Sequence, residues 1–263
     1  MHIYSACAVG VGAVLTSPAN AESWAASSLP IIGGRSVSQA GPVDWPAGDP
    51  VLHFDRARTE ITGSQNGAQF TTTIRKTVTG LCILHRLEGD IDVTFTFVYT
   101  ANAVANRHLD AVAVAVNPAQ PFAGISIPGV TLPAITLEAG VFQQAGQNFK
   151  QFRQALQNPA HPRAGNKHHK HAQGEAPGHN QGVIFTALAN PVGSFVYQSP
   201  DHGRLDVPGL GRVYFAEWWG EPYRQSVTLL RVMVENSQDR LNPAGTFSGQ
   251  IVIDGEENGR EFP

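Results

Sequence analysis

The sequence predicts a mainly β protein, built as a single β-sandwich or barrel-like domain with one helix and one long histidine-rich loop. Charged residues make up only 15 % of the 263 residues, whereas glycine (27) and proline (18) are plentiful. That balance favours short strands and turns over long surface helices. From Val51 onward, apolar and polar residues alternate with a period of two, which is typical of strands with one buried face.

Residues 1–21 are predicted to be a signal peptide. Ala6–Leu15 is a short run of apolar and small residues, and Ala19-x-Ala21 is the pattern that signal peptidase accepts. Cleavage would fall before Glu22, so the expected location is secreted or periplasmic. The alternative is that the apolar run is a buried N-terminal strand.

Residues 22–50 are rich in Ser, Pro and Gly and are expected to form an extended N-terminal arm. Residues 51–263 are expected to form the β-rich domain. Its clearest strand is Asp92–Tyr99, where Val, Phe and Tyr alternate with Thr. Ser226–Val234 is apolar on both faces and is predicted to be a central strand. Further strands are predicted at Gln69–Thr79, Ala111–Val116, Val183–Ala187, Ser194–Tyr197, Arg204–Val207, Arg212–Trp218 and Gly249–Ile253.

The one predicted helix covers Glu138–Gln157. Its aromatic and leucine side chains recur at spacings of seven, three and four, which places them on one helical face. These residues are Phe142, Phe149, Phe152 and Leu156. Asn158-Pro159 ends the helix, and a polar insertion at residues 158–182 follows directly.

The insertion is the most informative segment for function, because it gathers five of the ten histidines. Imidazole and carboxylate groups suit divalent metals such as Zn, Ni or Cu. The candidate ligands are His168, His169, His171, Glu175 and His179. Ligands on a flexible loop lose conformational entropy on binding, so the predicted metal binding is loose. The alternative is a solvated loop that binds metal only incidentally.

Within this insertion, His169-x-His171-x-x-x-Glu175 is followed, after six intervening residues, by Gly182. The pattern resembles the first metal-binding motif of the cupins. The resemblance implies a divalent metal inside a β-barrel and, as an alternative function, a metal-dependent enzyme. The chain departs from the cupin pattern where Arg163 replaces a glycine, and the second cupin motif is absent from the sequence.

A second candidate site is Glu217-Trp218-Trp219. Aromatic rings stack on sugar faces and carboxylates bind sugar hydroxyls, so this run predicts ligand binding and, as a further alternative function, a carbohydrate-binding module. The competing interpretation is a strand end at which Trp218 belongs to the core.

Two smaller patterns contain histidine. Cys82-x-x-His85 has the spacing of half a metal site, but residues three apart on a strand point to opposite faces, so we expect no site there. His53-x-Asp55 places an imidazole and a carboxylate on one strand face, and we expect a surface hydrogen bond. If the signal peptide is removed, Cys7 leaves with it and Cys82 has no disulfide partner in the chain.

Charge and hydropathy exclude two classes of partner. The formal net charge of −3 gives no basic field for nucleic acid, and no apolar run reaches the ~20 residues of a membrane helix.

No acid, base and nucleophile set converges in the sequence. The predicted function is therefore an exported β-rich binding or structural domain without catalysis, whose ligand is an extracellular protein or glycan.

Overall fold

The fold is mainly β in the computed structural model, which describes residues 2–16, 19–100, 111–132, 135–137, 183–186, 204–221, 224–235 and 247–261. No helix occurs in these ranges. Consequently, none of the described residues belongs to a helix that could cross a membrane. The predicted helix at Glu138–Gln157, the histidine-rich insertion and the predicted strand Ser194–Tyr197 all lie outside the described residues.

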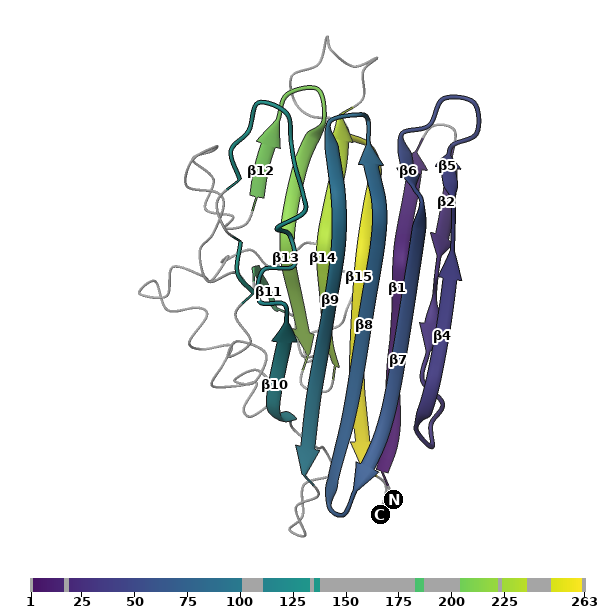
Figure 1. Ribbon diagram of the computed structural model, residues 1–263, viewed down its shortest axis with the longest axis vertical. Coiled ribbons are helices and arrows are strands. Elements are labelled where there is room, and N and C mark those ends of the chain that lie inside the picture. Colours follow the sequence, from purple (N-terminus) through teal and green to yellow (C-terminus); the bar gives the residue numbers. More distant parts are fainter. Residues whose placement is uncertain are drawn as a thin grey trace, which may run out of the picture.

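The strands form two antiparallel sheets, one behind the other (Figure 1). The first sheet has the order β11-β13-β14-β15-β1-β2, with β12 paired to β13 and β3 paired to β1. Its strands are β1 (His2–Thr16), β2 (Ala19–Trp24), β3 (Ser27–Ser28), β11 (Val183–Thr186), β12 (Arg204–Val207), β13 (Gly211–Glu221), β14 (Arg224–Glu235) and β15 (Phe247–Glu261). The predicted central strand is confirmed, because β14 lies between β13 and β15.

The second sheet has the order β10-β9-β8-β6-β5, and β7 pairs with both β8 and β4. Its strands are β4 (Gly34–Ala40), β5 (Val43–Trp45), β6 (Leu52–Phe54), β7 (Arg56–Asn66), β8 (Gln69–Ile83), β9 (Leu87–Thr100) and β10 (Ala111–Asn117). Residues 22–50, which the sequence presents as an extended arm, thus contain β3, β4 and β5, which pair with β1, β7 and β6.

The inner face of the second sheet follows directly from the sequence alternation. Along β9, Phe95 and Phe97 are 5 % and 6 % exposed, whereas Thr94 and Thr96 on the other face are half-buried. The two phenylalanine rings stack with their centroids 6.3 Å apart. The prediction that these phenylalanines are buried is therefore confirmed.

The core lies between the two sheets. Trp24 of the first sheet packs edge-on against Trp45 and Phe54 of the second, with ring centroids 6.1 and 5.7 Å apart. Phe215 on β13 is fully buried and packs in the same way against Phe122, at 5.2 Å. Such edge-to-face pairs add to the free energy that burial of the rings already contributes.

The apolar N-terminal run forms β1, which lies between β15 on one side and β2 and β3 on the other. Val11 and Ala13 are 0 % and 1 % exposed. A Cβ atom added at Gly10 would lie 2.8 Å from the Cβ of Ala25 and 3.4 Å from that of Ala57 on β7, so glycine lets β1 approach the second sheet closely. The apolar N-terminal run is thus a buried strand in the structure, and its cleavage as part of a signal peptide stays a prediction.

Candidate functional site

Three side chains of metal-ligating type meet at one end of the β8–β9 hairpin, on the outer face of the second sheet. The Sγ atom of Cys82 lies 3.6 Å from Nδ1 of His85 and 3.9 Å from Oε1 of Glu88. One ligand atom from each residue lies within 4.8 Å of the other two. Among the described residues, this is the one group of three such side chains.

The hairpin turn explains why these residues meet. Cys82 on β8 and Glu88 on β9 are directly opposite each other in the ladder, so their side chains share a face. The chain then reverses through Leu84 and His85, both with φ of 50°, and the N–H of Arg86 donates to the carbonyl of Ile83 at 3.0 Å. Consecutive positive φ angles normally fall on Gly, Asn or Asp, and they strain other residues.

This geometry corrects the sequence argument against Cys82-x-x-His85. Residues three apart point to opposite faces only where a strand runs through all four positions, but β8 ends at Ile83 and the turn brings the imidazole back beside the thiol. Burial raises the pKa of the Cys82 thiol, and the nearby Glu88 carboxylate raises it further, against an opposing hydrogen bond from His85. In the absence of a metal, Cys82 is therefore a thiol at neutral pH and a poor nucleophile.

Next to this group, His53 lies directly opposite Cys82, on β6. Its Nδ1 atom lies 2.8 Å from Oδ1 of Asp44, and its Nε2 atom lies 3.3 Å from Oδ1 of Asp55. The predicted surface hydrogen bond between His53 and Asp55 is confirmed, and β5 adds Asp44 as a second carboxylate. Hydrogen bonding to Asp44 is the largest cause of a raised pKa at His53.

We expect an NMR titration to give His53 a pKa above the ordinary 6.5. Because the folded-state pKa is raised, this imidazolium stabilises the fold fully below about pH 6.5, and the effect is lost as the pH rises through the folded-state pKa. Asp44→Asn should lower the pKa of His53 more than Asp55→Asn does. A larger effect of Asp55→Asn would contradict this assignment.

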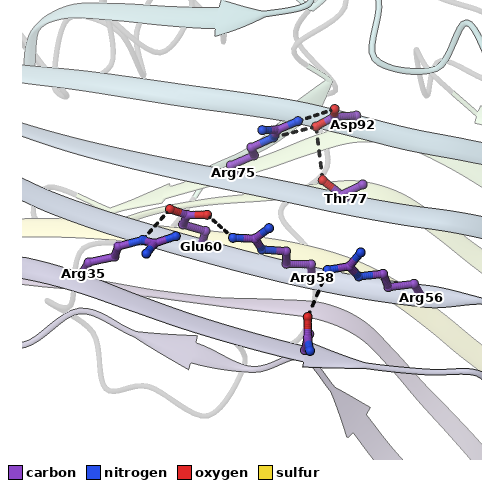
Figure 2. A network of polar contacts seen from close by, with 8 residues as sticks. Arg35, Arg56, Arg58, Glu60, Arg75, Thr77 and Asp92 are labelled. Carbon is purple, nitrogen blue, oxygen red and sulfur yellow. Dashed lines mark hydrogen bonds and ion pairs between the residues drawn. The ribbon is translucent and has the colours of Figure 1, made fainter.

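A third group is a network of arginines and carboxylates on the outer faces of β4, β7, β8 and β9 (Figure 2). Glu60 accepts from Nε of Arg35 and from Nη2 of Arg58, both at 2.7 Å. Asp92 accepts from Nε and Nη2 of Arg75 at 3.1 and 2.8 Å. Two further members, Thr77 and Arg56, donate to Asp92 and to Gln39.

The arginines fix the charge of the carboxylates they contact. The hydrogen bond from Arg35 is the largest cause of the lowered pKa of Glu60, and the hydrogen bond from Arg75 does the same for Asp92. Both acids are therefore ionised at neutral pH. Arg35, Arg58 and Arg75 thus pair with these two carboxylates, whereas Arg56 donates to the neutral amide of Gln39.

The site residues predicted in the histidine-rich insertion and on the tryptophan run are not members of these three groups of described residues. The predicted metal ligands His168, His169, His171, Glu175 and His179 lie outside the described residues. Glu217, Trp218 and Trp219 lie on β13, whose backbone pairs with β11 on one side and β14 on the other. Their ladder positions are thus interior to the first sheet.

The sequence carried a signal for the arginine network. Arg56-x-Arg58-x-Glu60 places three charged residues at a spacing of two, which puts them on one face of a strand. Partners on other strands, such as Arg75 and Asp92, become visible only once the register is known.

Comparison with known proteins gives one match. Residues 2–105 are similar to a family model described as a Domain of unknown function (DUF8256). The matched segment contains β1 to β9, and with them the Cys82 group, His53 and the arginine network. Neither a curated protein nor a solved structure is significantly similar to the chain.

Proposed function

We propose that the protein is an exported, non-catalytic binding domain that holds an acidic polysaccharide against the outer face of its second sheet. The observation that carries this proposal is the arginine network on β4, β7 and β8. Within it, Arg35 and Arg75 are held by ion pairs on strands of one sheet, and their side chains remain 61 % and 56 % exposed. Export is proposed from the leader-like pattern that ends at Ala21, and cleavage there would remove β1 but none of the arginines of this surface.

The exposed arginines retain the donors that such a ligand needs. A guanidinium has five N–H donors in a fixed fork. Arg35 is 61 % exposed in its side chain and gives its Nε donor to Glu60, while Arg75 is 56 % exposed and gives two donors to Asp92. The remaining donors can bind a carboxylate or sulfate group in a bidentate manner.

A row of threonines beside the arginines favours a sugar as the bearer of that acid. In the ladder, Arg35 lies opposite Thr62, Thr62 opposite Thr73, and Thr73 opposite Thr96. The row therefore presents one guanidinium and three hydroxyl groups across four strands, with a spacing of about 4.8 Å between strands. A regular array of this kind suits a polymer whose hydroxyl and acid groups repeat.

The test measures binding of polygalacturonate by isothermal titration calorimetry at two salt concentrations. We expect binding that weakens with salt, because partly exposed charges are screened. Arg35→Gln combined with Arg75→Gln should weaken it at least ~10-fold, since bidentate contacts to charged groups are lost. The matched control is Arg212→Gln on β13, which should bind like wild type.

Neutral dextran serves as the second ligand and should not bind measurably. Equal affinity of wild type and the Arg35/Arg75 double variant for polygalacturonate would refute the proposed surface. Thermal unfolding of each variant checks that the fold is retained.

A further inference from the structure

We infer that Cys82, His85 and Glu88 form a Zn²⁺ site at the end of the β8–β9 hairpin. The three residues supply one sulfur, one nitrogen and one oxygen ligand from β8, the turn and β9. This site is separate from the polysaccharide surface proposed above, and neither proposal depends on the other.

Two of the three interatomic distances are close to those around a tetrahedral ion, and the third, between the ligand atoms of His85 and Glu88, lies within 4.8 Å against about 3.4 Å around such an ion. With Zn–S near 2.3 Å and Zn–N and Zn–O near 2.1 Å, tetrahedral angles place the sulfur roughly 3.6 Å from each of the other two ligand atoms. The Sγ–Nδ1 distance of 3.6 Å meets this value, and the Sγ–Oε1 distance of 3.9 Å requires only a small rotation of Glu88. The glutamate is exposed, so such a rotation meets little resistance.

The donor set selects the class of metal. A thiolate excludes Mg²⁺ and Ca²⁺, which take oxygen ligands, whereas a mixed sulfur, nitrogen and oxygen set suits Zn²⁺. Three protein ligands leave the fourth tetrahedral position for water or another exogenous ligand. His53, although opposite Cys82 in the ladder, has both ring nitrogens facing carboxylates and is not assigned as the fourth ligand.

The turn that carries His85 is fixed by the hairpin itself. Leu84 and His85 both have positive φ, as the two central residues of a tight hairpin turn require. The paired strands β8 and β9 therefore hold the imidazole beside the thiol.

Binding has a defined proton balance. The thiolate is the form of cysteine that binds the metal, so Zn²⁺ displaces one proton from Sγ of Cys82 to the solvent. The charged and titratable groups around the sulfur are His53 on β6, His85 in the turn and Glu88 on β9. Affinity is therefore expected to fall as the pH is lowered, and calorimetry in buffers of different ionisation enthalpy should count about one proton released.

Cobalt(II) provides the decisive test, because a cobalt–thiolate bond gives a charge-transfer absorption band that imidazole ligands do not give. The protein is prepared without a histidine tag and with Cys7→Ser, which leaves Cys82 as the one thiol among the two cysteines of the chain. We expect the band to saturate at one equivalent of cobalt. Adding Cys82→Ser should abolish the band, and adding His85→Ala or Glu88→Gln should weaken binding at least ~10-fold.

Two controls separate this site from other parts of the molecule. His169→Ala with His171→Ala alters the histidine-rich insertion and should leave the thiolate band unchanged. Arg35→Gln with Arg75→Gln should also leave it unchanged, so failure of the polysaccharide proposal would not affect this one. Absence of the band in the Cys7→Ser protein, or a band that neither His85→Ala nor Glu88→Gln weakens, would overturn the inference.

Discussion

Replacing Phe95 by Ala is expected to lower the free energy of unfolding by about 3–5 kcal/mol, the range found for buried aromatic residues. The ring is 5 % exposed, stacks on Phe97 and lies on the inner face of β9, which pairs with β8 on one side and β10 on the other. Its removal leaves a cavity that long paired strands on either side cannot close. Urea denaturation monitored by circular dichroism gives the measurement.

The matched control is Thr96→Ala, one residue further along β9 and on the outer face. Thr96 is half-buried at the surface, and we expect a change within about 0.5–1 kcal/mol. If the two variants had the same denaturation midpoint, the assignment of inner and outer faces along β9 would be wrong.

Val11→Asp is expected to prevent folding of the full-length chain. Val11 is fully buried on β1, and a carboxylate placed there has no charged partner in a position that was apolar. Burying an unpaired charge costs several kcal/mol, comparable to the whole stability of a domain. Circular dichroism and size-exclusion chromatography of the purified variant provide the measurement.

Val14→Asp is the control on the same strand, because Val14 is 46 % exposed. It should fold like wild type. If residues 1–21 are instead a cleaved signal peptide, neither substitution should affect folding of the mature protein, because that protein would begin at Glu22 and contain neither valine. N-terminal sequencing of native protein, together with a recombinant chain that starts at Glu22, distinguishes the two. A stable, folded chain beginning at Glu22 would show that β1 is dispensable.

The strands that sequence predicts well are those with a strong contrast between their faces. On β9, phenylalanines alternate with threonines, and the predicted strand Asp92–Tyr99 lies within the observed Leu87–Thr100. On β7 the buried positions include Ala57, Thr59 and Gly63, whose small or polar side chains give little contrast with the outer face. β1 is built from Ala, Gly and Val, and such a run also satisfies the pattern of an apolar leader.

The Cys82 group shows why the site was harder to predict than the strands. Strand periodicity separates Cys82 from His85, and only the conformation of the turn reunites them. Sequence rules assign positive φ to glycine and asparagine, and Leu84 and His85 break that rule. Local rules fail at this point because the paired strands, and not the residues of the turn, determine where the turn must lie.

The pairing of β1 with β15 has a consequence for the order of folding. His2 lies opposite Glu261, and the two ends of the chain lie side by side (Figure 1). Contacts between residues so distant in sequence form late, because the intervening chain must first be brought together at a large entropic cost. During synthesis, β1 leaves the ribosome long before β15, and it cannot pair on that side until β15 follows. We therefore expect slow, post-translational completion of the first sheet, with the apolar β1 segment dependent on a chaperone until then.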